Sequence, residues 1–231
     1  MKLITVVATT IDDAWFQCIS LVMEHGREFK IDYGSFAGQK RKELDYITIQ
    51  ITHPGVRPLV PQIPPQYGIP NPTSIEYVEQ QYLPYLMVDH KEPDEDYTYG
   101  MYIEPQLRKI IERYRRIFNE TGGYRSNQEY ITVSNYLDHL EMKDPPCLRG
   151  IDTRIQDNML HFFCYFRSWD LFAGFPSNLA GIQLMKEYMA SEIGVQDGEL
   201  IAASKGLHLY DHFWPLANVR LGKKNEPGQI C

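Results

Sequence analysis

The sequence predicts an α+β fold in which a predominantly antiparallel sheet is packed by helices. Strands are marked by β-branched and aromatic residues at 46–53 (YITIQITH) and 160–166 (LHFFCYF). Helices are marked by apolar residues at helical spacing at 102–118 and 179–193. With at least one further helix near the N-terminus, this balance of elements is typical of the α+β class.

The first quarter of the chain predicts a strand, a helix and a second strand. Residues 3–7 form the first strand, and residues 12–25 form a helix with Asp12 or Asp13 as its cap and Gly26 as its end. The strand at 46–53 follows. The proline-rich passage at 54–72 excludes a regular helix or a central strand. Its apolar residues predict a loop wrapped over the surface rather than a linker; they are Val56, Leu59, Val60, Ile63 and Ile69.

The remaining elements follow the same two kinds of pattern. A helix is expected at 73–87, capped by Thr73 or Ser74 and kinked or ended at Pro84, and an acidic turn at 89–96. The helix at 102–118 ends before Gly122-Gly123. Short strands are expected at 130–134 and 160–166, a buried helix at 179–193, and a strand pair or a strand and turn at 200–206 and 207–212.

Length and composition favour one domain over residues 1–231. The chain is 43% hydrophobic, which is enough for a real core, and 23% charged, which is ordinary for a globular protein. Residues 54–98 form a variable, proline-rich and acidic region within it. The polar segment 223–231 is expected to be a mobile tail.

The charge balance and the cysteines exclude several classes of protein. A net charge of −7 gives no general footprint for nucleic acid, although a local group of arginines can still bind one phosphate. No run is apolar enough for a membrane helix, and the N-terminus lacks the features of a signal peptide. Cysteines at 18, 147, 164 and 231 have no metal-ligand spacing, so we expect no metal site, and reduced thiols in the cytoplasm.

Residues suited to chemistry gather between positions 144 and 212. Four short segments follow one another there: DPPC at 144–147, FRSWD at 166–170, FPSNLA at 175–180 and HLYDH at 208–212. No single segment is decisive. Their order within one stretch is much more specific than any of them.

Cys147 is the candidate nucleophile. The two prolines before it fix an extended backbone that presents its side chain from a rigid position. A thiol attacks as the thiolate, and a guanidinium nearby, from Arg167 or Arg149, would lower its pKa. The alternative is a buried and unreactive cysteine, which is the commoner fate of a single Cys.

The other segments offer groups that bind polar ligands. Arg167 and Ser168 suit a phosphate or carboxylate, unless the arginine pairs with Asp170 in a turn. Asn178 offers one donor and one acceptor, as a uracil edge requires, unless it caps a helix. His208 and Tyr210 point the same way on a strand, which suits one sugar hydroxyl or two packed core residues.

Taken in order, these segments resemble the thymidylate synthase family. The nucleophile segment of that family stands here as PPC at 145–147, its phosphate segment as RSWD at 167–170, its base-reading segment as PSNLA at 176–180 and its ribose segment as HLYDH at 208–212. A weaker likeness extends to Tyr99-Gly100, Arg125 and ITVS at 131–134. The segment DPPCLRGIDTRIQD and the short chain most resemble members of the archaeal branch of the family.

The resemblance implies a fold, a reaction and an assembly. The fold is thymidylate synthase-like, with one sheet face forming a homodimer interface. The reaction is reductive methylation of dUMP to dTMP, in which Cys147 adds to C6 of the pyrimidine. The methyl group and the hydride come from 5,10-methylenetetrahydrofolate or from a methylene-tetrahydromethanopterin-type pterin.

The resemblance also implies catalytic roles for Asp170, which helps to order the pterin and nearby waters, and for Tyr99, which assists removal of the C5 proton through water. Substrate binding falls to five further residues. Arg167 and Ser168 hold the phosphate, Asn178 reads the pyrimidine edge, and His208 and Tyr210 bind the ribose 3′-hydroxyl.

Three features depart from the family pattern. Leu148 follows the nucleophile, where the family usually has His. The usual pair of adjacent arginines from the partner subunit is not evident, which leaves Arg125 as the candidate for phosphate binding in trans. The family's remote glutamate has no clean match; Glu79 is the candidate, although a solvent-facing glutamate on a helix is its plainer interpretation. Arg41 or Lys42 is the candidate for the N-terminal phosphate loop.

Two other functions remain open. A pyrimidine nucleotide 5-hydroxymethylase, acting on dUMP, dCMP or CMP, shares the scaffold and the nucleophile. Cytosine-specific relatives typically carry Asp where Asn178 stands, so Asn178 favours uracil. The third possibility is a non-catalytic nucleotide- or RNA-binding relative. Retention of Cys147 together with Arg167, Asn178 and His208 argues against it.

Overall fold

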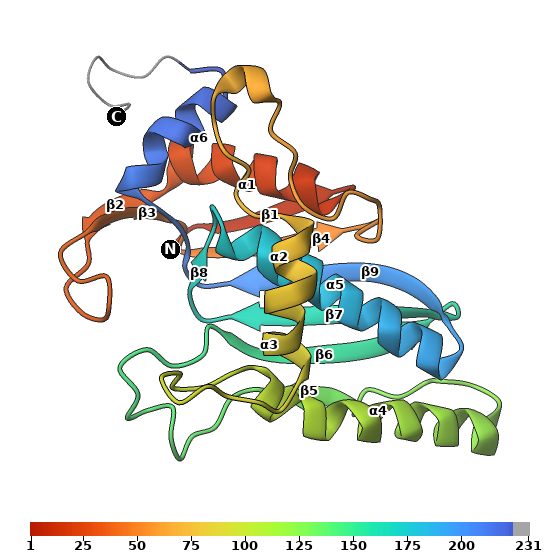
Figure 1. Ribbon diagram of the computed structural model, residues 1–231. Coiled ribbons are helices and arrows are strands. Elements are labelled where there is room, and N and C mark those ends of the chain that lie inside the picture. Colours follow the sequence, from red (N-terminus) through yellow and green to blue (C-terminus); the bar gives the residue numbers. More distant parts are fainter. Residues whose placement is uncertain (224–231) are drawn as a thin grey trace.

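Two sheets and a group of helices make up the computed structural model, which describes residues 1–223 (Figure 1). Six strands form one sheet in the order β1-β4-β9-β7-β6-β5, and four form a second sheet in the order β2-β3-β10-β8. The strands are β1 (Leu3–Ala8), β2 (Arg27–Lys30), β3 (Lys40–Glu43), β4 (Tyr46–Ile51), β5 (Tyr130–Thr132), β6 (Leu148–Gln156), β7 (Met159–Phe166), β8 (Trp169–Asp170), β9 (Gln196–Ser204) and β10 (Leu207–Tyr210). The main helices are α1 (Ile11–His25), α2 (Ile75–Tyr77), α3 (Leu83–Met87), α4 (Gly100–Thr121), α5 (Gly174–Ile193) and α6 (Trp214–Arg220).

The prediction of an α+β fold with mainly antiparallel strands is confirmed. Antiparallel pairs join β4 to β9, β6 to both β5 and β7, and β3 to both β2 and β10. Parallel pairs join β1 to β4, β7 to β9, and β8 to β10. Each parallel pair is connected through at least one helix or through another strand, as the longer crossover requires.

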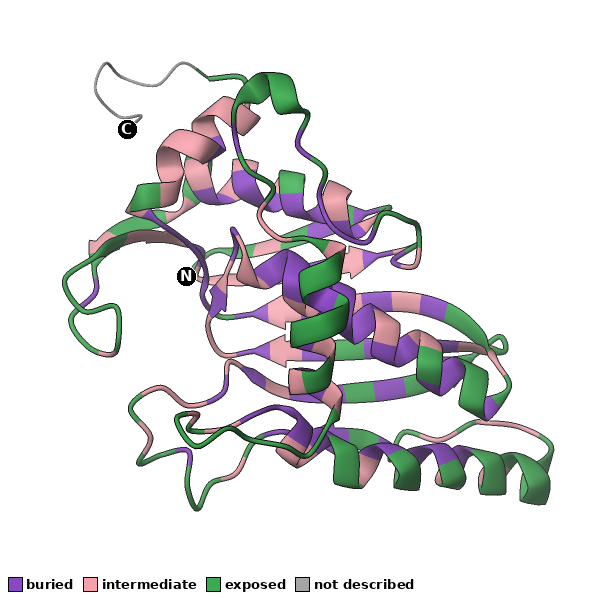
Figure 2. Ribbon diagram, in the orientation of Figure 1, coloured by how far each residue is buried: buried purple, intermediate pink, exposed green. Residues whose placement is uncertain are grey.

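Helices cover one face of the six-stranded sheet. Figure 1 shows α5 running across this face, with α2 and α3 in front of α5 and α4 along the edge at β5. Helix α5 is buried along most of its length, whereas the outer side of α2 is exposed (Figure 2). The core therefore lies between the sheet and α5, with α1 packed against α5 beside it.

No helix covers the other face of this sheet within residues 1–223. The register places Val7 opposite Gln50 and Phe163 opposite Ile201 on that face. Several of its apolar side chains are exposed, among them Leu3 (78%), Val7 (60%) and Phe163 (36%). An uncovered apolar face of this extent is typical of a surface that binds another protein.

Helix α1 is close to its predicted range, but its cap is different. Thr10, rather than Asp12 or Asp13, is the N-cap, and its hydroxyl accepts a hydrogen bond from the Asp13 amide at 3.2 Å. The Asp13 carboxylate in turn accepts from the Thr9 amide at 2.8 Å. Thr10 and Asp13 thus each provide an acceptor for a main-chain amide at the N-terminal end of α1. Gly26 ends the helix as predicted.

The predicted helix at 73–87 is divided into three parts. Ser74 is the cap, since its hydroxyl accepts from the Tyr77 amide at 3.1 Å. A π-helical turn, η2 (Val78–Tyr82), separates α2 from α3, and Pro84 lies in the first turn of α3. A proline has no amide hydrogen to donate, and its ring clashes with the carbonyl group four residues before it. The change of helix type at this point accommodates Pro84.

Two boundaries were predicted wrongly in ways that affect the site. Helix α5 begins at Gly174 rather than at 179, so Asn178 lies inside the helix and is not its cap. Pro176 is tolerated in the first turn, where its missing amide has no partner to lose. Strands β9 and β10 do not form a pair with each other, because β9 joins the six-stranded sheet and β10 joins β3 and β8.

The sequence did not predict β2, β3, β6, β8 or α6. Strands β2 and β3 read REFK and KRKE, and these charged runs have none of the apolar alternation that marks a strand. The wrapped loop at 54–72 is confirmed: Leu59, Val60, Ile63 and Ile69 are buried, although Val56 is exposed. From residue 224 on, the tail that was expected to be mobile lies outside the described residues. No helix among residues 1–223 is long and apolar enough to cross a membrane.

Candidate active site

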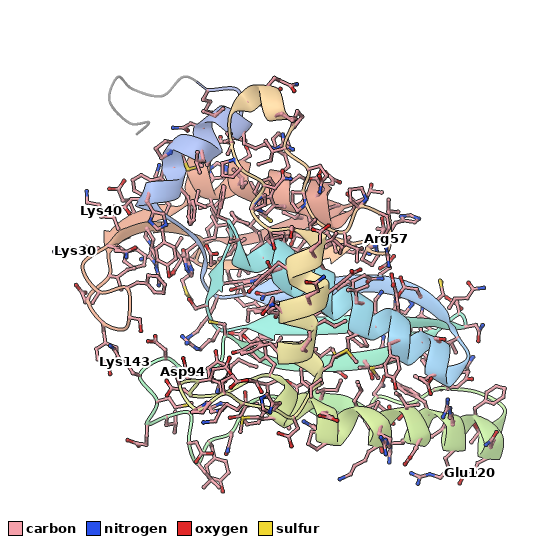
Figure 3. The ribbon with its side chains drawn as sticks, viewed as in Figure 1. Lys30, Lys40, Arg57, Asp94, Glu120 and Lys143 are labelled. Carbon is pink, nitrogen blue, oxygen red and sulfur yellow. The ribbon has the colours of Figure 1, made fainter. Side chains whose placement is uncertain are left out.

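Cys147 lies in a cavity of about 630 Å³ beside the second sheet. Strands β3 and β10, the β2–β3 loop and the connection between β5 and β6 all contribute to its walls. That connection carries Lys143, which Figure 3 shows on the same side of the molecule as Lys30 and Lys40 of the β2–β3 hairpin. Seven side chains singled out in the sequence line the cavity: Arg41, Cys147, Arg167, Ser168, Asp170, His208 and Tyr210.

Cys147 is the last residue before β6, and its main chain is held on both sides. Its carbonyl oxygen accepts from the Arg167 amide at 2.8 Å, and the following amide, of Leu148, donates to the Tyr99 hydroxyl at 3.3 Å. Burial raises the pKa of the thiol above its ordinary value, and the Arg167 guanidinium is the strongest influence that lowers it. Arg149 lowers it less. The thiolate needed for attack therefore depends mainly on Arg167.

The Arg167 guanidinium is aimed by the chain that precedes the nucleophile. Its Nε donates to the carbonyl oxygens of Pro145 and Pro146 at 3.1 and 3.2 Å, and its Nη2 also donates to Pro145. These neutral acceptors orient the side chain without cancelling its charge. Arg167 is therefore ready for an anion, as a phosphate-binding arginine must be.

Asp170 does not pair with Arg167. Its carboxylate accepts from the amides of Phe172, Ala173 and Gly174 at 3.2, 3.1 and 2.8 Å, at the N-terminal end of α5. Burial raises the pKa of this carboxyl, and the three amides act in the opposite direction. Asp170 thus fixes the start of the helix that carries Asn178, while its side chain also lines the cavity.

His208 presents an unpaired acceptor. Its Nδ1 lies 2.8 Å from the carbonyl oxygen of Gly206, so this nitrogen carries the hydrogen and donates it. Burial, with Arg41 as a further cause, lowers the pKa of His208 from 6.5 to about 3, which keeps the ring neutral. Its Nε2 is therefore an unprotonated acceptor, and it is buried without a hydrogen-bond partner. Such a group calls for a donor from a ligand, and a sugar hydroxyl fits.

Tyr210 and Arg41 form the wall next to His208. The Tyr210 ring stacks on Phe36 of the β2–β3 loop with centroids 4.7 Å apart, and burial raises the pKa of its hydroxyl to about 12. Arg41 pairs with Glu43 at 2.6 Å and stands opposite Tyr210 in the register of β3 and β10. Lys42 instead places its ammonium over the Trp214 ring, outside the cavity. Of the two candidates for the phosphate loop, the structure thus brings Arg41 to the site.

Asn178 lines a second cavity of about 340 Å³, which shares Ala173 with the first. Its Oδ1 accepts from Trp169 Nε1 at 2.9 Å, and its Nδ2 donates to the Tyr82 hydroxyl at 2.8 Å. Each end of the amide retains one further hydrogen-bonding position. The amide is therefore held in one orientation and can still bind a ligand.

Tyr99 lies behind the nucleophile rather than in the lining of the cavity. Its side chain is buried, and burial raises the pKa of its hydroxyl well above the ordinary value. Its ring contacts Tyr97 and Tyr85 at centroid distances of 5.7 and 5.4 Å. These rings form an aromatic group next to the strand start at Leu148.

Besides Asn178 and Tyr99, two further predicted site residues lie outside the Cys147 cavity. Glu79 is exposed on the π-helical turn η2 and lines neither the Cys147 cavity nor the Asn178 cavity. Arg125 lines a separate, larger cavity of about 1250 Å³ between the end of α4 and the β6–β7 turn. Within one chain, neither residue therefore lies with Cys147 in its cavity.

The sequence missed several residues that complete the site. Glu43, Lys143 and Phe36 line the Cys147 cavity, and Tyr82 and Trp169 hold Asn178. Trp169 had a usable signal, because it stands between the two matching residues of the RSWD segment. Tyr82 had none, since its approach depends on the packing of η2 against α5. Across residues 1–223, no group of three or more His, Cys, Asp or Glu side chains is placed to hold a metal ion.

Comparison with known proteins gives consistent results. Residues 99–229 match the model of the family described as thymidylate synthase. The chain is 27% identical over 215 residues to a protein named putative thymidylate synthase from Methanosarcina barkeri, with 90% of each chain covered. It is 31% identical over 124 residues to the thymidylate synthase of Symbiobacterium thermophilum, which covers 53% of this chain and 43% of that protein.

A solved structure gives the same result for the fold. Thermostable thymidylate synthase A from Bacillus subtilis superimposes with a TM-score of 0.69, covering 94% of this chain and 86% of that one. The two sequences are 14% identical, so this likeness concerns the fold alone.

Proposed function

The chain belongs to the thymidylate synthase family, and from that premise we propose that it converts dUMP to dTMP by reductive methylation at C5 of the pyrimidine. Membership of the family implies a methyltransferase-type enzyme. The substrate and the product are the part that we propose. The observation that carries the proposal is one cavity that holds a cysteine beside an uncancelled arginine charge and a neutral histidine with a free acceptor.

Each of these groups suits a different part of dUMP. Arg167, with Ser168 next to it, binds the phosphate, because its guanidinium is oriented by carbonyl oxygens and carries a free charge. His208 Nε2 accepts a hydrogen bond from the ribose 3′-hydroxyl, and Tyr210 assists from the same strand face. Arg41 lies at the wall of the same cavity, where it is paired with Glu43 at 2.6 Å, and it is the second guanidinium within reach of a phosphate.

The Cys147 thiolate attacks C6 of the pyrimidine. The attack forms the S–C6 bond and shifts the electron pair of the C5–C6 double bond, which makes C5 nucleophilic. Asn178 orients the base through its remaining donor and acceptor. Tyr99, behind the nucleophile, assists removal of the C5 proton through water, and elimination of the thiolate at the end of the reaction restores the double bond.

The family uses folate-type pterins, and the Asn178 cavity, which meets the Cys147 cavity at Ala173, suits such a group. That cavity is lined by Tyr77 and Tyr82, whose rings offer apolar faces to a flat heterocycle, and by the hydroxyls of Thr73 and Ser177. When bound, a methylene-tetrahydropterin supplies the one-carbon unit and the hydride. Asp170 lies at the boundary of the two cavities, through Ala173 and Gly174, and helps to order the pterin.

We also propose a homodimer through the open face of the six-stranded sheet. This face exposes Leu3, Val7 and Phe163, together with Tyr130 of β5. Arg125 lies outside the Cys147 cavity of its own chain, so any contribution to phosphate binding comes from the partner subunit. Burial of an apolar face of this kind stabilises an obligate dimer by removing it from water.

A product analysis tests the reaction. The protein is incubated with equal amounts of dUMP and dCMP and with methylenetetrahydrofolate, and the nucleotides are weighed by mass spectrometry. Methylated dUMP is the expected product. A hydroxymethylated nucleotide would assign the chain to the pyrimidine hydroxymethylases instead. If no product forms, the same assay with methylene-tetrahydromethanopterin distinguishes a different donor from an inactive protein.

The covalent step is tested by replacing the nucleophile. Cys147→Ser is expected to abolish turnover and to leave dUMP binding largely intact, because the serine hydroxyl is a much weaker nucleophile at neutral pH. Cys164→Ala is the matched control, since Cys164 is buried in β7 outside the cavity. Turnover by Cys147→Ser at the rate of this control would exclude the covalent mechanism.

A further inference from the structure

The side chain of Asn178 is held between two hydrogen-bonding groups, of which only one can both donate and accept. Trp169 Nε1 donates to its Oδ1 at 2.9 Å, and its Nδ2 donates to the Tyr82 hydroxyl at 2.8 Å. An indole N–H is a donor only, whereas a phenol hydroxyl can donate or accept. If the amide turned over, Tyr82 would rotate its hydrogen and stay bonded, but Trp169 would face an NH₂ group with no acceptor. Trp169 alone therefore fixes the orientation.

The indole itself has little freedom to adjust. Trp169 is buried, and its ring stacks on Phe166 and Phe175 with centroids 4.0 and 4.5 Å apart. Its amide donates to the carbonyl oxygen of Gly206 at 3.0 Å, which fixes the main chain as well. Tyr82 is confined on the other side, because a Cβ added to Gly181 would lie 2.6 Å from its ring. Both partners of Asn178 are thus set by the core.

The orientation decides which base edge the amide can bind. Uracil offers a carbonyl acceptor beside an N–H donor, and cytosine offers an amino donor beside an unprotonated nitrogen acceptor. An amide that turns freely pairs with either edge, whereas a fixed amide pairs with one of them. Asn178 lines the 340 Å³ cavity that meets the Cys147 cavity at Ala173, so a base attacked by Cys147 lies within reach of its remaining donor and acceptor if the proposed function is correct.

We infer that Trp169 is a specificity-determining residue, which acts through Asn178 to make the site select uracil over cytosine. The inference rests on the proposed function for the identity of the ligand. It adds that selectivity between the two bases depends on a buried residue that does not itself contact the base. The residue between Ser168 and Asp170 thus has a positioning role, which is to orient Asn178.

The test compares substitutions of the two hydrogen-bond partners at the two ends of the amide. Trp169→Phe removes the indole N–H and keeps an aromatic ring in the stack, and Tyr82→Phe removes the hydroxyl from the other end. Binding of dUMP and of dCMP is measured by calorimetry for the wild type and for both variants. We expect the ratio of the two dissociation constants to shrink by about tenfold in Trp169→Phe, because the unpaired buried donor that penalised the turned amide is gone. In Tyr82→Phe the ratio should stay within about threefold.

The ratio separates a positioning role from a merely structural one. Loss of packing in Trp169→Phe would weaken both nucleotides by the same factor and leave the ratio unchanged, and that result would overturn the inference while the proposed function stands. An equal loss of selectivity in Tyr82→Phe would also overturn it. If the wild type binds neither nucleotide, the proposed function and the inference fail together.

A measurement on the wild type does not depend on how the variants fold. The indole N–H of Trp169 should give a nuclear magnetic resonance signal that exchanges slowly with solvent, both without ligand and with dUMP bound. Rapid exchange in the dUMP complex would mean that the bond to Asn178 is broken when the base is read, and the inference would be wrong.

Discussion

The free acceptor on His208 leads to a prediction that can be worked out in detail. Its Nδ1 donates to the Gly206 carbonyl at 2.8 Å, and its Nε2 is buried with no partner in the protein. His208→Phe removes both nitrogens and keeps a planar ring on β10. The Gly206 carbonyl retains the amide of Trp169 at 3.0 Å, so the variant leaves no new unpaired group there. The main change is the loss of the acceptor at Nε2.

The magnitude follows from the burial of that atom. A buried polar group that gains its missing partner is worth about 1–3 kcal/mol, which corresponds to about 5- to 150-fold in a dissociation constant. We therefore expect dUMP to bind His208→Phe less tightly than the wild type by a factor in this range. Removal of the 3′-hydroxyl from the nucleotide should weaken binding to the wild type by a similar factor. It should have little effect on His208→Phe, because the partner is already missing.

The pKa of His208 gives the pH dependence its sign. The folded protein holds the ring neutral down to about pH 3, whereas the unfolded chain protonates near pH 6.5. Below about pH 6.5 the unfolded state therefore binds a proton that the folded state does not, and the stability contributed by this residue is lost as the pH falls towards 3. Nε2 remains an acceptor across the neutral range. The contribution of the 3′-hydroxyl to binding should thus be constant from about pH 5 to pH 8.

Calorimetry on dUMP and on its 3′-deoxy analogue, with both proteins at several pH values, tests this account. Equal preference of the two proteins for the 3′-hydroxyl would refute the assigned contact. A preference in the wild type that titrates near pH 6.5 would refute the neutral tautomer, because a protonated ring has no acceptor.

Three further predictions concern other parts of the molecule. Gly100→Ala should lower the free energy of unfolding by about 3 kcal/mol or more, because its Cβ would overlap main-chain atoms of the segment before α4. Chemical denaturation measures this, and Gly123→Ala, where a Cβ meets nothing within 4 Å, is the control; equal stability of the two variants would contradict it. Phe163→Arg should weaken the proposed dimer by about 100-fold, because it places an unpaired charge in the interface. Sedimentation should show monomers for this variant and unchanged dimers for Tyr188→Arg on the exposed side of α5, and a dimeric Phe163→Arg protein would exclude the open sheet face. Asn178→Asp should lower the preference for dUMP over dCMP by about tenfold or more, and an unchanged preference in competition binding would remove Asn178 from base recognition.

The sequence predicted best those elements that are marked by their own residues. The apolar runs of β4 and β7, the amphipathic face of α4 and the buried anchors of the 54–72 loop were all recognisable, because each is marked by its own residues. The cavity residues were recognisable for another reason. They lie in short segments whose order along the chain is specific, although the segments come from different strands.

The parts that failed depend on contacts between distant segments. The KRKE run of β3 is a strand only because β2 and β10 pair with it on either side. The sequence left open a helix cap as the alternative role of Asn178, because the start of α5 at Gly174 depends on the Asp170 carboxylate, four residues earlier. The free acceptor of His208 and the bond from Trp169 to Asn178 are properties of the folded core. No pattern of residue types along the chain shows which nitrogen of a histidine is left without a partner.

The close approach of Tyr82 to Gly181 has an evolutionary consequence. Helix α5 has no side chain at this point, and the tyrosine ring fills the space where one would be. A substitution at either position alone would leave a hole or a collision in the core. We therefore expect the two positions to change together among relatives, with a larger residue at 181 only where 82 is small.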